Sequence, residues 1–286
     1  MSAIGLIRIG ELSHRAGVSV DRLRAWERRY GLLEPTRTPR GYRLYSPADE
    51  RRVRAMRDQL AAGVSAAQAA AAVLGPERRG LPAPDAVRQS RAELTAALTG
   101  FDEPRAMRLL DALFAQLGDE PAIDAVIFPV LRQVGEGWAS AELHVGQEHF
   151  ASTLVEARLL ERFHAQTGPG GPRALLACAP GERHTLGLIA LALGLRRRGW
   201  SVTYLGADTP LPDLRRSVAQ LEPAAVVLSA VMAGRFDDAA SLREVAAHAP
   251  LALGGPGASR AVADGIGARL LPGDPFSAAE TLSGVR

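Results

Sequence analysis

The pattern of apolar segments after Arg173 restricts the fold of this chain more than any other feature. Short apolar runs of strand length alternate with longer segments in which apolar residues recur at helical spacing. We expect strands at 174–179, 202–205, 225–229, 251–253 and 269–271, and helices at 184–199, 211–221 and 238–248. Strands that alternate with helices form a parallel, doubly wound α/β sheet, whose ligands lie beyond the carboxyl ends of the strands.

The N-terminal residues predict a separate unit of short helices. Apolar residues at helical spacing cover Ile9–Ala16 and Val20–Tyr30, and the glycine-containing turn between them makes a helix-turn-helix candidate. Prolines and a glycine interrupt the chain over 34–45, whose ends alternate like a short hairpin, or wing. Ser46 and Ser65 each predict a further helix, because an acid or amide three residues later completes a capping box.

Between these two units the chain holds almost no β signals. Its helical runs are broken at Gly100, at Gly118–Asp119 and over 135–146, which predicts a four-helix bundle. Stretches rich in Pro and Gly on either side of the bundle are typical of linkers. We therefore place domains at 1–75, 91–167 and 172–286, with a linker at 76–90.

Arginine supplies all 34 basic residues, and it is unevenly distributed. Residues 1–75 hold 13 Arg against 7 acids, a surplus of 6, whereas the remaining 211 residues hold 21 Arg against 24 acids, a deficit of 3. Guanidinium groups form bidentate hydrogen bonds with phosphate and guanine, so the N-terminal surplus favours a nucleic-acid partner. A GC-rich coding bias would explain the use of Arg over Lys, but not this asymmetry.

The composition excludes several protein classes. With 47% hydrophobic and 23% charged residues, the chain is not intrinsically disordered. No apolar stretch reaches the roughly 18 residues of a membrane span, and the start lacks a secretory signal, so we expect a cytoplasmic protein. The one cysteine, Cys178, excludes an internal disulfide and a multi-Cys metal site, and we interpret it as a small buried residue.

Three motifs follow one another within residues 6–74. They are Ile7-x-Ile9-Gly10-Glu11-Leu12, Leu23-Arg24-x-Trp26-Glu27-Arg28-x-Tyr30-Gly31 and Gly41-Tyr42-Arg43-Leu44-Tyr45. Together they closely resemble the winged-helix DNA-binding domain of the MerR family of transcriptional regulators. The resemblance implies that the second helix enters the major groove, with binding that weakens steeply as salt rises. The implied contacts are Val20, Asp21 and Arg22 near base edges, Arg24 and Arg28 at phosphates, and Arg37, Arg40, Tyr42 and Arg43 along the DNA backbone.

Three further motifs lie at the ends of predicted strands. The first strand is followed by Glu182-Arg183-His184-Thr185-Leu186-Gly187, the third ends in Ser229-Ala230-Val231 and the fourth in Gly254-Gly255. In this order they resemble cobalamin-binding Rossmann domains. The resemblance implies that His184 is the lower axial ligand of cobalt and that Glu182 bonds its other ring nitrogen. It also implies that Gly187, Gly254 and Gly255 leave room for the cofactor tail, which Ser229 would bond.

The predicted bundle contains Trp138 followed, after nine residues, by Glu148-His149. This spacing resembles a signature of light-sensing cobalamin regulators of the CarH/LitR type. The resemblance implies that Trp138, Glu148 and His149 cover the adenosyl group on the upper face of cobalt. Members of that type usually have His directly after the Trp, as the upper ligand formed in light. Here Ala139 stands in its place, and its methyl group cannot bind metal, while His144 lies five residues on.

The combined resemblance implies a transcriptional repressor, not an enzyme, that depends on adenosylcobalamin and responds to light. It implies a homotetramer bound to operator DNA in the dark, which separates when light breaks the cobalt–carbon bond. Ala139 keeps open a regulator that senses cobalamin or another tetrapyrrole without light. A corrinoid carrier or cobalamin-dependent enzyme subunit is a third reading, because bundle and Rossmann modules also resemble those of methionine synthase and corrinoid methyltransferases.

Overall fold

The computed structural model describes residues 7–33, 35–37, 42–61, 64–66, 68–70, 73–74, 84–166, 170–271 and 273–284. Contacts divide the chain into two compact units, Met1–Leu81 and Pro82–Arg286. Arg40 and residues 76–83 of the predicted linker lie outside the described residues. No helix in the described part of the chain is long and apolar enough to cross a bilayer.

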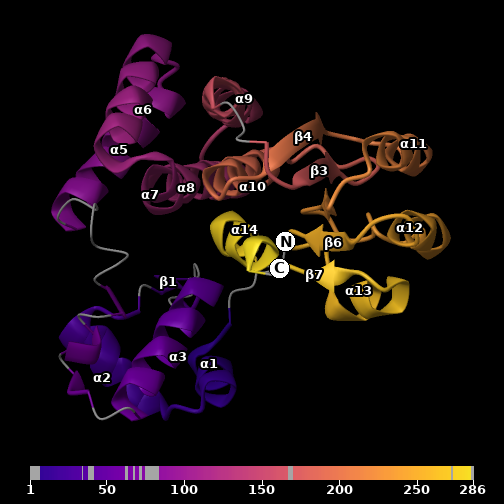
Figure 1. Ribbon diagram of the computed structural model, residues 1–286. Helices are drawn as coiled ribbons and strands as arrows, with labels where there is room; N and C mark the ends of the chain where they lie inside the picture. Colours follow the sequence, from indigo (N-terminus) through magenta and orange to yellow (C-terminus); the bar gives the residue numbers. More distant parts are fainter. Residues whose placement is uncertain are drawn as a thin grey trace. The chain divides into compact units, whose positions relative to one another are not determined.

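The first unit consists of short helices and a two-stranded hairpin (Figure 1). Its elements are α1 (Ile9–Ala16), α2 (Val20–Tyr30), β1 (Thr36–Arg37), β2 (Arg43–Leu44) and α3 (Pro47–Ala61). Strand β1 pairs antiparallel with β2, so the predicted wing is confirmed. The described residues between 66 and 74 are helical, within the fourth predicted helix.

One apolar core holds the first unit together. Leu23 and Trp26 of α2 are buried in it with Tyr45, Val53 and other residues of the unit. The predicted capping box at Ser46 is present, because Asp49 Oδ2 accepts from the Ser46 amide at 2.8 Å and Ser46 Oγ accepts from the Asp49 amide at 3.2 Å. Local signals in the sequence were therefore sufficient for most of this unit.

The second unit begins with the predicted four-helix bundle. The helices are α5 (Pro84–Thr99), α6 (Glu103–Leu117), the continuous run of α7 (Asp119–Ala122), η1 (Ile123–Ile127) and α8 (Phe128–Ala139), and α9 (Val145–Ala165). Helix α5 begins at Pro84, so residues 84–90, which the sequence placed in the linker, are helical. Proline fits the first turn of a helix, because the amide that it lacks has no partner there.

The predicted helix break over 135–146 is too long. Helix α8 continues through Gly135 and Gly137, and only the residues after Ala139 leave the helix. A Cβ atom at Gly137 would lie 2.9 Å from Leu143 Cδ1. Gly137 therefore lets the connection to α9 fold back against α8, rather than ending the helix.

The rest of the second unit is a parallel sheet with helices on both faces. The strands are β3 (Arg173–Cys178), β4 (Ser201–Gly206), β5 (Ala225–Ser229), β6 (Leu251–Gly254) and β7 (Arg269–Leu270), in the order β4-β3-β5-β6-β7. The helices are α10 (Leu186–Arg197), α11 (Leu211–Leu221), α12 (Ala239–Ala246), α13 (Arg260–Ile266) and α14 (Pro275–Ser283). The predicted α/β class is confirmed, although α13 and α14 were not predicted.

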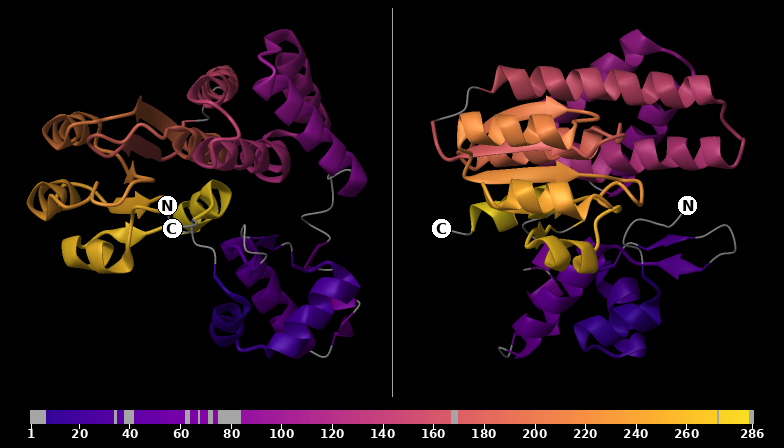
Figure 2. Two further views of the ribbon diagram at one scale, coloured as in Figure 1. Left: turned by 180° about the vertical axis from the view of Figure 1, so that it is seen from behind. Right: turned by 90° about the vertical axis from the view of Figure 1, so that its right-hand side faces the viewer.

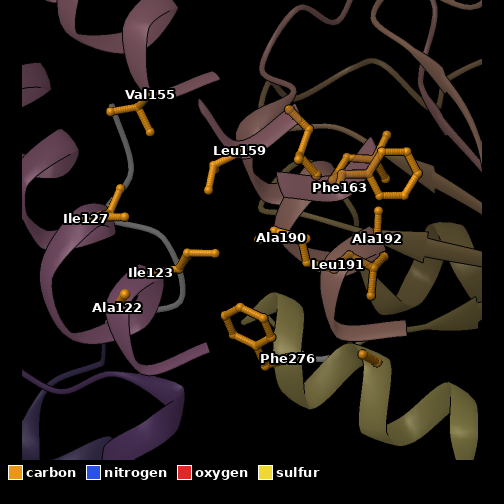
Figure 3. Close-up of a cluster of buried hydrophobic side chains, with 14 of the residues drawn as sticks. Ala122, Ile123, Ile127, Val155, Leu159, Phe163, Ala190, Leu191, Ala192 and Phe276 are labelled. Carbon is orange, nitrogen blue, oxygen red and sulfur yellow. The ribbon is translucent and has the colours of Figure 1, made fainter. Parts of the chain in front are cut away.

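The two faces of the sheet are covered differently. Helices α11, α12 and α13 lie on one face, and α10 and α14 lie on the other (Figure 1). On the second face the apolar side chains of the bundle continue directly into those of the α/β part, as Ile123, Leu159, Phe163, Leu191 and Phe276 illustrate (Figure 3). Bundle and sheet therefore share one core, which fixes the position of α9 relative to the strands.

We predict that Gly255→Ala destabilises the second unit by more than about 2 kcal/mol. Gly255 has a φ of +83°, and a Cβ atom there would lie 2.3 Å from the backbone oxygen of Ala230. Urea denaturation followed through the fluorescence of the buried Trp200 provides the measurement. Gly265→Ala is the matched control, because its Cβ meets open space on a helix, and it should leave stability unchanged or raise it by up to about 1 kcal/mol. Equal effects of the two changes would contradict the packing described here.

Candidate functional site

A buried carboxylate organises the turn that follows β3. Glu182 Oε1 accepts hydrogen bonds from the amides of Arg183 at 2.8 Å and His184 at 2.9 Å, and lies 2.5 Å from His184 Nδ1. Its Oε2 accepts from the amides of Val231 at 2.8 Å and Met232 at 2.9 Å. The Glu182 side chain thus joins the β3 turn to the loop after β5. It also binds the amides of residues 183 and 184 outside the helix, and α10 begins at Leu186 rather than at the predicted position 184.

Glu182 remains ionised despite being 1% exposed. Burial alone would raise the pKa of this carboxyl group, but donated hydrogen bonds from the Met232 and His184 amides, the His184 ring and the Val231 amide lower its pKa to about 2. An ionised carboxylate only accepts hydrogen bonds, so His184 Nδ1 carries the proton in this pair. In the tautomer that carries this proton, the lone pair of the ring is at Nε2.

The His184 ring is oriented but open to a ligand. Its side chain is 59% exposed, and within the described residues Nε2 has no hydrogen-bond partner. The neighbouring backbone is also held, because Thr185 Oγ1 donates to Glu156 Oε1 at 2.5 Å and the His184 carbonyl accepts from Cys178 Sγ at 3.7 Å. A fixed imidazole with a free Nε2 can bind a metal ion from one side.

Cys178 is fully buried, as the sequence indicated. Burial, and then the charges of Glu182 and Glu156, raise the pKa of its thiol to about 12. It therefore stays protonated and does not compete with His184 as a metal ligand.

The other predicted positions of the α/β part lie along the carboxyl edge of the sheet. Cys178, Ser229 and Gly254 are register partners at the ends of β3, β5 and β6. A Cβ atom at Gly187 would meet nothing within 4 Å, so the space beside the His184 turn is open. Gly255 is required by its own loop, because a Cβ atom there would collide with the backbone oxygen of Ala230.

Helix α9 carries the bundle past this edge. Near its C-terminal end, the carbonyls of Phe163 and Gln166 accept hydrogen bonds from Arg196 at the end of α10, whereas Glu156 bonds Thr185 just before α10 begins. The two helices thus run parallel, and the N-terminal part of α9 extends beyond the carboxyl ends of the strands (Figure 2). Glu148 is eight residues before Glu156, or about 12 Å at 1.5 Å per residue.

The predicted cap residues occupy the projecting end. His149 lies about 1.9 turns before Glu156 on α9, so it faces the same side as the bond to Thr185. Glu148 lies about 2.2 turns before Glu156 and is turned by about 80° from that side. Glu148 Oε2 lies 3.7 Å from His149 Nε2. Trp138, in the last turn of α8, is 47% exposed, which is unusual for a tryptophan that serves only packing.

Ala139 and His144 are the two positions that bear on the upper cobalt ligand implied by the family resemblance. Ala139 is the exposed last residue of α8. His144 is exposed, stacks on Phe101 with ring centroids 5.8 Å apart, and bonds Gln147 through its amide at the start of α9. His144 is therefore engaged in closing the helix end.

The predicted DNA contacts of α2 form an exposed surface. Asp21, Arg22, Arg24 and Arg28 are exposed and Val20 is half-buried. Among the described residues, the side chains of the three arginines have no ion-pair partner. Arg24 and Arg28 are one turn apart, on the side of α2 opposite the buried Leu23 and Trp26.

The wing contributes a second part of this surface. Tyr42 and Arg43 are exposed, and the guanidinium group of Arg8 lies 5.5 Å from the centre of the Tyr42 ring. Arg37 belongs to β1, but its side chain, like all of Arg40, is outside the described residues.

Three residues with clear structural roles were not identified from the sequence. They are Arg8 beside the wing, Glu27 on α2, and Glu156, which connects α9 to the His184 turn. Glu27 lies between Trp26 and Arg28 in the second N-terminal motif. Its charge, at a position where the helical spacing favours an apolar residue, was the signal in the sequence that could have identified it.

Comparisons with known proteins agree with this architecture. The family model described as MerR HTH family regulatory protein matches residues 7–74, and two models described as B12 binding domain match residues 90–160 and 172–278. The monomethylamine corrinoid protein of Methanosarcina barkeri has a TM-score of 0.60 and 19% identity, over 70% of this chain and 99% of that chain. This last likeness shows the fold alone.

Two relatives match most of the chain. The HTH-type transcriptional repressor CarH of Myxococcus xanthus is 39% identical over 242 residues, which are 81% of each protein. The HTH-type transcriptional repressor CarA of the same organism is 37% identical over 259 residues, 88% of this chain and 87% of CarA. The chain is accordingly a regulator and not an enzyme, which removes the carrier or enzyme-subunit reading. It belongs to the family of MerR-type transcriptional regulators with B12-binding domains that includes CarH and CarA.

Proposed function

We propose that this chain is an adenosylcobalamin-dependent repressor that binds operator DNA as a homotetramer in the dark and releases it in light. The observation that carries the proposal is the His184 imidazole, whose Nδ1 is bonded to a buried carboxylate and whose Nε2 is exposed at the carboxyl edge of the sheet. The relatives named as repressors and the B12-binding domain matches support the cobalamin and DNA parts.

The residues present fit a corrinoid. His184 supplies one neutral imidazole ligand, and the open space beside Gly187 leaves room for a large ring next to it. The N-terminal part of α9, which carries Glu148 and His149, projects over the same edge, and Trp138 offers an exposed indole for stacking. When bound, adenosylcobalamin supplies a cobalt–carbon bond that light breaks.

The chain's own residues would convert this photochemistry into release of DNA. In the dark, Trp138 would stack on adenine, while Glu148 and His149 would bond ribose hydroxyl groups. These contacts hold the junction of α8 and α9 in one arrangement, on which assembly depends. In light the three residues lose that partner. A tetramer that has come apart binds weakly, since each DNA-binding unit then acts alone.

A second candidate is a regulator that responds to cobalamin or another tetrapyrrole without light. Ala139 favours it, because a methyl group offers no upper ligand after illumination, and His144 is already engaged at the start of α9. This candidate shares the cofactor site and the DNA surface with the first, so only the response to light separates them.

The proposal predicts a change of assembly with light. In size-exclusion chromatography with light scattering, adenosylcobalamin should convert the purified chain to a tetramer in the dark, and green light should return it to a smaller species. Trp138→Ala should remain small in the dark with the cofactor present. A cofactor-bound mass that is the same in dark and light would instead support the second candidate.

Replacing the ligand histidine should weaken cofactor retention. His184→Ala is expected to lower cobalamin affinity by at least about tenfold, since mutation in or next to a ligand set typically costs 10–100-fold. Equilibrium dialysis with hydroxocobalamin gives the affinity. His248→Ala, which removes an exposed histidine of the same unit, is the control and should bind normally. Unaltered binding by His184→Ala would contradict the ligand assignment.

The helix arginines should act through phosphate. Arg24→Ala and Arg28→Ala should each weaken binding to every duplex to a similar degree and reduce the slope of log K against log salt by about 0.9. Fluorescence anisotropy over a range of salt concentrations measures both quantities. Arg105→Ala, an exposed arginine of α6, serves as the control. Retention of the full slope by both helix variants would exclude them as phosphate contacts.

A further inference from the structure

Glu27 of α2 connects the recognition helix to the wing. Its side chain is 20% exposed, and both of its carboxylate oxygens are used. Oε2 accepts a hydrogen bond from the Tyr45 hydroxyl at 2.8 Å, and Oε1 lies 3.1 Å from Nε of Arg43. One acid therefore contacts a residue of strand β2 and the residue that follows the strand.

The Tyr45 contact holds the Glu27 side chain in place. Tyr45 is fully buried, and its backbone exchanges two hydrogen bonds with Ile7, at 2.9 and 2.8 Å. Burial, followed by the hydrogen bond to Glu27, raises the pKa of the Tyr45 phenol, so the hydroxyl remains a donor. Because the buried Tyr45 hydroxyl fixes Oε2, the other oxygen, Oε1, is directed at Arg43 of the wing.

We propose that Glu27 is a positioning residue that holds the Arg43 guanidinium group beside α2, so that it forms one phosphate-binding surface with Arg24 and Arg28. The inference rests on the proposed DNA-binding function. Arg43 has a long side chain on a strand of two residues, and without a partner it would sample many rotamers. An ion pair formed before DNA binds reduces the entropy that must be lost on binding.

The negative charge of Glu27 makes it possible to separate positioning from a purely electrostatic effect. A carboxylate close to DNA repels phosphate, so if it acted only through its charge, removing it would strengthen binding. If Glu27 acts by positioning Arg43, removing its charge weakens binding instead. The two accounts predict opposite signs for the same substitution.

The test uses the full chain and one duplex, selected by the wild-type protein from a random-sequence library. Glu27→Gln leaves at most a neutral hydrogen bond to Arg43, while its amide can still bond the Tyr45 hydroxyl. Binding is measured by fluorescence anisotropy at several salt concentrations, for Glu27→Gln, Arg43→Ala and the double variant. We expect Glu27→Gln to bind about 3- to 10-fold more weakly, with the slope of log K against log salt shallower by up to about 0.9, one phosphate contact.

The double variant should bind no more weakly than Arg43→Ala alone, since both changes remove the same contact. Tyr45→Phe keeps the charge of Glu27 but removes its anchor, and should weaken binding in the same direction. Binding by Glu27→Gln that is equal to or tighter than wild type would overturn the proposal. So would weaker binding with an unchanged slope, because a fold defect only lowers the fraction of active protein. A wild-type chain that selects no duplex would overturn the proposed function, and this inference with it.

Discussion

The arrangement of the second unit depends on the buried Glu182 carboxylate. Its five hydrogen bonds connect the turn after β3 with the loop after β5, two segments separated by about 50 residues of chain. An ionised group without hydrogen-bond donors in the interior would cost several kcal/mol. The donors around Glu182 therefore keep it ionised, and its charge holds those donors in place. The same carboxylate selects the His184 tautomer, which leaves Nε2 as the available ligand atom. Structure and chemistry at this edge therefore have one physical cause.

The shared core extends this control to the bundle. Because α7 and α9 pack directly against α10, and the apolar side chains of the bundle share one core with those of α10 and α14, the bundle cannot shift without disturbing the helices that cover the sheet. The hydrogen bond from Thr185 to Glu156 adds a polar connection between α9 and the turn before α10. The position of the projecting end of α9 relative to His184 is thus set by the fold. Under the proposed function, a cofactor bound at His184 would contact both the sheet and the bundle. Loss of its adenosyl group would then change the contacts at the junction of α8 and α9.

Most of the fold could be predicted from local patterns. Apolar periodicity and capping residues located α1, α2, β5 and α11 at their observed bounds, since these signals act within a few residues. Prediction failed where distant packing decides. Gly137 lies within α8 where Leu143 packs against it, and α10 starts late because Glu182 accepts hydrogen bonds from the amides before it. Helix α13 was missed because its seven residues include a glycine and show little amphipathic pattern.

The candidate site shows the same division. Motifs located Glu182 and His184, and the structure gives the geometry between them. Glu27 and Glu156 were missed because each acts through a partner 16 or more residues away, which no local motif records. The roles of Trp138, Glu148 and His149 remain predictions, and so do those of Ser229 and the glycines along the edge.

The central claim is that one imidazole, oriented by a buried carboxylate, binds cobalt. It is tested most directly by electron paramagnetic resonance of the chain loaded with cob(II)alamin, prepared with natural-abundance or nitrogen-15-labelled histidine. If His184 is the axial ligand, the superhyperfine pattern changes from a triplet to a doublet on labelling, and this change is absent in His184→Ala. A triplet that persists in the labelled protein would mean that the cofactor's own base stays on cobalt, and would contradict the account.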